Sequence, residues 1–122
     1  MQGLHLLAEW FGCSAQLAPM CRAEALQALC EQLTRDAGLS VVGACFHQFQ
    51  PQGATGTLVL AESHVAIHTW PESGWVTLDI FACNYSGDNS AKAEQLYAAL
   101  KQLFQPQRER LQRIQRGASG VA

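Results

Sequence analysis

A serine, a carboxylate and two histidines lie close together near the middle of this 122-residue chain. Glu62 and Ser63 stand at a junction between two strand-like runs. His64 and His68 follow on one face of the second run, because side chains alternate along a strand. A hydroxyl beside imidazole and carboxylate groups suits nucleophilic or acid–base chemistry. The same pattern also fits an ordinary loop with packed or solvated neighbours.

The turn at Glu62 and Ser63 lacks the residues that a tight hairpin prefers. A two-residue connection favours Asn-Gly or another pair with positive φ, and neither Glu62 nor Ser63 adopts that backbone cheaply. Such local exceptions concentrate at functional sites. A serine hydrolase is one interpretation, but no G-x-S-x-G elbow surrounds Ser63.

Hydrophobic periodicity predicts the elements that position these residues. Helices are expected over 19–37, with Gly38 just past the end, and over 90–104, with N-cap candidates at 88–90. Strands are expected over 5–11, 40–49, 55–61, 64–70, 75–83 and, on a weaker pattern, 108–115. The short connections between the central strands force antiparallel neighbours.

The strand over 75–83 predicts the fold class, because both of its faces are too apolar for open water. One face carries Val76, Leu78, Ile80 and Ala82, and the other carries Trp75, Thr77, Asp79, Phe81 and Cys83. We expect an α+β, two-layer fold, an antiparallel sheet with two helices on one face. The chain has no further element for the other face, so a second copy is the natural cover. We therefore expect a homodimer or higher homo-oligomer whose sheets stack into an αββα sandwich.

Composition excludes several function classes. A net charge of −2, with 48% hydrophobic and 15% charged residues, indicates one globular domain over 1–122. The chain shows no apolar run of about 20 residues and no signal peptide, so a cytoplasmic location without a membrane partner is expected. The basic cluster over 108–116 is interrupted by Glu109 and lacks aromatic residues, which argues against nucleic acid. Five scattered cysteines without a CxxC pair predict neither a disulfide framework nor a metal site.

The segment over 62–72, ESHVAIHTWPE, resembles the processing segment of the short, pyruvoyl-dependent S-adenosylmethionine decarboxylase proenzymes of prokaryotes. The similarity continues in register on both sides. It includes GLHLLAE over 3–9, Cys13, FHQFQPQG over 46–53 and DIFAC over 79–83. The resemblance therefore covers nearly the whole chain.

This resemblance implies a zymogen that cleaves itself between Glu62 and Ser63, giving a β chain of 1–62 and an α chain of 63–122. The Ser63 hydroxyl attacks the Glu62 carbonyl, and elimination and hydrolysis of the resulting ester leave a covalent pyruvoyl cofactor at residue 63. In this family, residues that match Thr55 and His68 take part in processing. Thr55 stands where serine is usual, and its extra methyl predicts slower processing.

The resemblance also implies the decarboxylase chemistry. The pyruvoyl carbonyl forms a Schiff base with the substrate amine and withdraws electrons as carbon dioxide leaves. Ser63, His68 and Cys83 are then the catalytic residues, with Cys83 as the proton donor. Phe49 stacks on adenine and Glu72 accepts from ribose hydroxyls. Judged without the family, Cys83 and Phe49 would be core residues and Glu72 a turn residue.

Several positions depart from the family pattern, which bears on the substrate more than on cofactor formation. They are Leu4, Ala54, Ser73, Asn84 and the C-terminal residues 113–117. The expected substrate is S-adenosylmethionine, decarboxylated for spermidine biosynthesis. The alternatives are arginine or ornithine, whose distal cation would need a carboxylate such as Asp79 or Glu72, and a non-cleaving regulatory paralogue.

Overall fold

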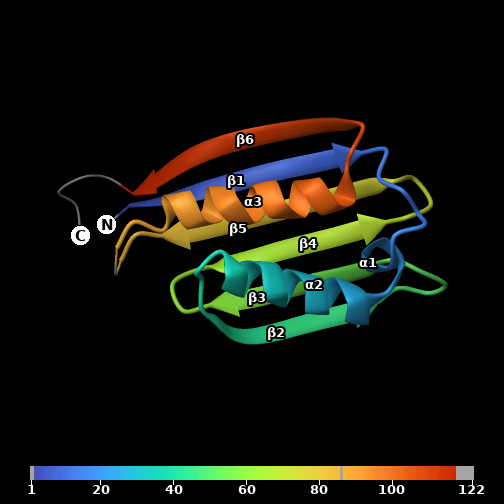
Figure 1. Ribbon diagram of the computed structural model, residues 1–122, viewed down its shortest axis with the longest axis horizontal. Coiled ribbons are helices and arrows are strands. Elements are labelled where there is room, and N and C mark those ends of the chain that lie inside the picture. The colour runs from blue at the N-terminus through green and yellow to red at the C-terminus, as the bar shows by residue number, and fades with distance from the viewer. Residues whose placement is uncertain (1, 86, 118–122) are drawn as a thin grey trace.

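The computed structural model describes residues 2–85 and 87–117 and contains a six-stranded antiparallel sheet in the order β2-β3-β4-β5-β1-β6 (Figure 1). The strands are β1 (Gln2–Phe11), β2 (Val41–Gln48), β3 (Ala54–Leu60), β4 (His64–Trp70), β5 (Trp75–Cys83) and β6 (Arg108–Gly117). The helices are α1 (Ala18–Cys21), α2 (Ala23–Asp36) and α3 (Ser90–Phe104). Helices α2 and α3 lie side by side on one face of the sheet (Figure 1).

The core lies between this helix layer and the sheet. The predicted apolar face of β5 is buried there, as are the inward side chains of α3. Large buried side chains include Trp10 of β1, Leu78 and Ile80 of β5, and Leu96, Leu100 and Phe104 of α3. Burial of these apolar side chains supplies the main driving force for folding. The two-layer α+β fold expected from the alternating pattern is confirmed.

The opposite face of the sheet, which we call the open face, is covered by no element of the described chain (Figure 1). It carries the half-buried Trp75 and Phe81 of β5. Val59 is 49% exposed and Ile114 is 43% exposed on the same face. Stacking of a second sheet on this face remains a prediction.

The single helix expected over 19–37 is wrong, because the structure breaks it at Arg22, whose backbone is extended. The cause is Gln48 at the end of β2. Its Nε2 lies 2.9 Å from the carbonyl oxygens of Cys21 and Gly53, and its Oε1 accepts from Ala23 N at 2.7 Å. The distant glutamine therefore satisfies the backbone groups that a continuous helix would have paired.

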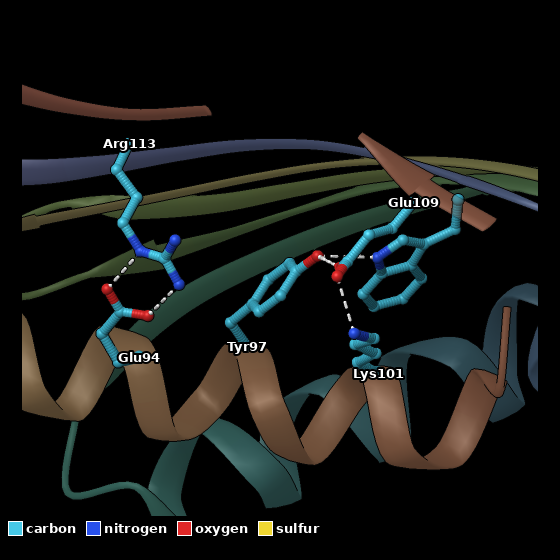
Figure 2. A network of polar contacts seen from close by, with 6 residues as sticks. Glu94, Tyr97, Lys101, Glu109 and Arg113 are labelled. Atoms are coloured by element: carbon cyan, nitrogen blue, oxygen red, sulfur yellow. Dashed lines mark hydrogen bonds and ion pairs between the residues drawn. The ribbon is translucent and has the colours of Figure 1, made fainter. Parts of the chain in front are cut away.

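The edge strand β6 follows a weak sequence pattern, and polar contacts fix it against α3 (Figure 2). Tyr97 of α3 donates to Glu109 of β6 at 2.5 Å, and Lys101 donates to the same carboxylate at 2.7 Å. Arg113 makes two hydrogen bonds to Glu94, at 2.7 and 3.0 Å.

Strand β1 begins at Gln2 and not, as the sequence pattern predicted, at residue 5. It is longer because it pairs on both sides, with β5 and with β6.

Candidate active site

Ser63 lies in the turn between β3 and β4 and is held against its own preceding carbonyl group. The Ser63 hydroxyl donates to the Glu62 carbonyl oxygen and accepts from the backbone N–H of Cys83 at 2.8 Å. The Ser63 carbonyl accepts from Leu60 N at 2.9 Å, which closes the turn. The tight connection thus places the nucleophile beside the peptide bond it would attack.

A small pocket of about 80 Å³ opens beside this turn. It lies where the β3–β4 turn meets the end of β5 and the start of α3, and Ser63, Cys83, Asn89 and Lys92 are among its lining residues. Asn89 is 7% exposed and donates to the Glu62 carboxylate. The sequence had indicated Asn89 only as a helix-cap candidate.

Two histidines and a carboxylate lie on the open face close to Ser63. His5 of β1 contacts the rings of His64 and Phe81, with centroids 6.1 and 5.6 Å apart, and its Nε2 lies 3.8 Å from the Asp79 carboxylate. Burial lowers the pKa of His5 below its ordinary value of 6.5; Asp79 opposes this shift, and Arg116 and His64 add to it. The motif over 3–9 contains His5, but nothing in its local pattern indicated this cluster.

The remaining predicted residues gather at the other end of the hairpin. The Thr55 hydroxyl and His68 Nδ1 are 2.6 Å apart across β3 and β4. His68 stacks on Trp70 at 5.8 Å, and Trp70 stacks on Trp75 at 4.4 Å. The bond to Thr55 and the stacked indoles fix the plane of the imidazole.

Phe49 and Glu72 line one hollow at that same end. The hollow measures about 660 Å³, and His47 and Trp70 also line it. An aromatic ring and a carboxylate facing one space suit a ligand with a flat ring and hydroxyl groups.

The structure therefore divides the predicted site residues into two sets. Glu62, Ser63 and Cys83 are in contact at one end of the sheet, whereas Thr55 and His68 lie at the other end with the Phe49 hollow. Ser63 and His68 are five residues apart in the hairpin, which corresponds to about 16 Å along a strand. Within one chain the two sets do not meet.

Two of the departures from the family pattern in the described chain lie near Ser63. One is Arg116 of the C-terminal residues, whose guanidinium lies 4.5 Å from the centroid of the Phe81 ring and which lines a hollow with Cys83; the other is Asn84. Leu4 and Ala54 are buried in the core, and Ser73 lies in an exposed turn. Asn84, in contrast, accepts from Asn89 N at 2.9 Å.

Three further observations concern disulfide bonds, metal binding and membrane insertion. All five thiols are unpaired. Over residues 2–85 and 87–117, no group of three or more His, Cys, Asp or Glu side chains is placed to hold a metal ion. Among the helices of that same described part, none has the length and apolar content needed to cross a bilayer.

Comparisons with known proteins match this chain to one family. The family model for S-adenosylmethionine decarboxylase matches residues 4–117. The S-adenosylmethionine decarboxylase proenzyme of Archaeoglobus fulgidus is 40% identical over 115 residues, covering 94% of this chain and 97% of that protein. The proenzyme of Picrophilus torridus is 34% identical, covering 95% of this chain and 85% of that protein.

A solved structure agrees as well. The adenosylmethionine decarboxylase of Aquifex aeolicus superposes with a TM-score of 0.87 at 37% identity, over 98% of this chain and 94% of that one. The molecule is thus a two-layer α+β protein whose candidate nucleophile, Ser63, lies in a hairpin turn. It belongs to the S-adenosylmethionine decarboxylase family, and the family resemblance seen in the sequence is confirmed.

Proposed function

We propose that this chain is the proenzyme of a pyruvoyl-dependent carboxy-lyase that acts on S-adenosylmethionine. The observation that supports this most directly is the position of Ser63 Oγ, which contacts both the Glu62 carbonyl oxygen and the Cys83 N–H. Self-cleavage between Glu62 and Ser63 would give chains of residues 1–62 and 63–122.

The geometry suits an acyl shift from nitrogen to oxygen. The Ser63 hydroxyl adds to the Glu62 carbonyl, the C–N bond breaks, and an ester to the serine oxygen forms while the nitrogen takes up the proton. Loss of the Ser63 α-proton then expels the Glu62 carboxylate. Water hydrolyses the remaining enamine, ammonia leaves, and residue 63 becomes a pyruvoyl group. A hydroxyl already in contact with its target carbonyl has little orientational freedom left to lose.

A base must remove the Ser63 α-proton, and His68 is the proposed candidate. Its Nδ1 pairs with Thr55, so the other ring nitrogen is available for proton transfer. Because His68 lies about 16 Å from Ser63 along the hairpin, His68 of a partner subunit would have to act. We therefore propose a homodimer with the two open faces in contact and the His68 end of one sheet against the Ser63 end of the other.

The uncovered apolar side chains of the open face support this arrangement. Exposed Val59 and Ile114 and the half-buried rings of β5 would lose contact with water when a second sheet covers them. The same packing would bring the hollow with Phe49 and Glu72 toward the partner's Ser63. Each complete site would then contain residues of both subunits.

In the proposed reaction the pyruvoyl group supplies an electron-withdrawing carbonyl for decarboxylation. Phe49 would hold the adenine by stacking, and Glu72 would accept from the ribose hydroxyls. Cys83 follows the open-face residue Phe81 by two positions on β5 and lines the pocket at Ser63, where its thiol would return a proton to the substrate carbon.

The denatured mass of freshly purified protein tests the proposal. We expect two fragments, the second lighter by the mass of ammonia than one beginning with free serine. A single chain that persists through long incubation would contradict self-processing and favour a regulatory paralogue. Carbon dioxide release from S-adenosylmethionine, arginine and ornithine, assayed separately, decides the substrate.

A further inference from the structure

Asn89, just before α3, donates to both of the residues whose backbone groups contact the Ser63 hydroxyl. Its Nδ2 lies 2.8 Å from the Glu62 carboxylate and 2.8 Å from the Cys83 carbonyl oxygen. A primary amide has two N–H groups, so it can donate to both acceptors at once. The residue is 7% exposed, and these bonds are therefore shielded from competing water.

The two acceptors belong to the residues that define the attack geometry. Glu62 supplies the carbonyl that Ser63 attacks, and Cys83 supplies the N–H that the Ser63 hydroxyl accepts. We propose, on the basis of the function above, that Asn89 is a positioning residue for self-cleavage. It fixes the Glu62 side of the scissile bond against the end of β5, so that nucleophile and carbonyl stay in contact.

Asn89 is itself held rigidly. Its backbone N–H donates to Asn84 Oδ1 at 2.9 Å, and its carbonyl accepts from Ala93 N at 3.0 Å in the first turn of α3. Asn84 also donates to Ser90 Oγ at 3.3 Å. Asn84, one of the residues that depart from the family pattern, thus holds the loop that contains Asn89.

A helix-capping role does not account for this side chain. In the described chain the Asn89 side chain makes no capping hydrogen bond to α3. The N–H of Ser90 is satisfied by Asp88 at 3.0 Å. The Asn89 amide donates instead to Glu62 in the turn that contains Ser63 and to Cys83 at the end of β5, which is the expectation for a positioning residue.

Asn89→Asp is the sharpest test, because it keeps the shape and replaces two donors by acceptors facing Glu62 and the Cys83 carbonyl. Chains labelled in a short pulse of cell-free translation are followed by mass. We expect the cleavage rate constant to fall at least about tenfold, since small misplacement of reacting groups is costly. Asp88→Asn, an exposed neighbour without a contact to Glu62, is the matched control and should cleave at the wild-type rate.

A second pair of variants separates positioning from a general loss of structure. In the double variant Glu62→Gln with Asn89→Asp, the new glutamine amide can donate to the new carboxylate, and we expect part of the rate to return. Hydroxylamine, which cleaves esters, should release few fragments from N89D, because the acyl shift itself is slowed. If N89D does not fold, as judged by its thermal unfolding, Asn89→Ala is measured in the same way and is also expected to slow cleavage.

Wild-type cleavage rates in a folded N89D or N89A would overturn the role of Asn89 and leave the proposed function intact. Abundant hydroxylamine-sensitive ester in a slow N89D would also overturn it, since the affected step would then be elimination. A wild-type chain that never cleaves would overturn both proposals together.

Discussion

Cys83 contributes to the site through two different atoms. Its backbone N–H donates to the Ser63 hydroxyl, whereas its thiol is the proposed proton donor in decarboxylation. A backbone group survives any side-chain substitution other than proline. Processing and turnover should therefore respond differently to a change at this residue.

Cys83→Ala is expected to cleave itself within about twofold of the wild-type rate, because the N–H remains. Decarboxylation should fall by about 10² to 10⁴, the usual contribution of a positioned general acid. Mass spectrometry measures the first quantity and carbon dioxide release the second. Cys45→Ala, at an exposed position of β2, should change neither. A C83A chain that decarboxylates normally would exclude the thiol as the donor.

His5 makes stability depend on pH. Burial holds the pKa of His5 below 6.5 in the folded chain; Asp79 opposes this effect, and Arg116 and His64 strengthen it. As the pH falls below 6.5, the unfolded chain takes up the proton first, so the free energy of unfolding decreases. The contribution of His5 is complete above pH 6.5 and is lost at more acidic pH.

We therefore expect wild-type protein to lose more stability between pH 7.5 and 5.5 than His5→Gln does. Urea midpoints at one fixed protein concentration measure this, because association would otherwise shift them. Parallel pH profiles for the two proteins would show that burial of His5 does not contribute.

At the scale of elements, the end of β2 organises the helix layer. The Gln48 side chain bonds to Ala23 at the start of α2 and to the carbonyl of Cys21 at the end of α1. It also lies 2.9 Å from the carbonyl oxygen of Phe49. A single amide thus joins the break between the helices to the loop that carries the substrate-binding candidate Phe49.

Gln48→Met is expected to destabilise the chain by about 2 kcal/mol, because it removes the acceptor of the Ala23 N–H and the donor to the Cys21 and Gly53 carbonyls. Urea unfolding measures this difference. Gln32→Met removes an exposed side-chain bond to Asp36 and should cost less than about 0.5 kcal/mol. Equal effects of the two substitutions would show that the Gln48 contacts are weak.

At the scale of the whole molecule, the proposed roles of Ser63 and His68 would make a complete site depend on association, because the two residues lie at opposite ends of the hairpin. Stable interfaces of this kind bury apolar surface at their centre. On the open face, the apolar side chains available for such an interface are the half-buried rings of β5 and the exposed Val59 and Ile114. Self-cleavage should then require the dimer.

Complementation between two inactive chains tests this dependence. Ser63→Ala and His68→Ala chains, each purified alone, should remain uncleaved. In the mixed dimer, the Ser63 of one subunit meets the intact His68 of the other, so we expect the H68A chain to cleave and the S63A chain to stay whole. Mass spectrometry distinguishes the two chains. Cleavage that never appears in mixtures that do exchange subunits would place both residues in one chain's site.

Much of this architecture could be predicted from the sequence, because it depends on local periodicity. Strands β4 and β5 and helix α3 begin and end where the pattern predicts, and the face of β5 carrying Leu78 and Ile80 is buried as expected. The alternation of side chains in a strand and the period of a helix extend over only a few residues, so residues close together in the sequence reveal them. The segment around Ser63 likewise identified the family.

The tertiary structure alone decided which distant groups meet. The break at Arg22 follows from Gln48, and the partners of Asn89 lie at residues 62 and 83. The spacing of Ser63 and His68 looked compatible with one site, yet an extended strand holds them apart. The physical reason is that hydrogen-bond partners depend on strand register and on the packing of helices across a sheet. Both are set by contacts between residues far apart in the chain.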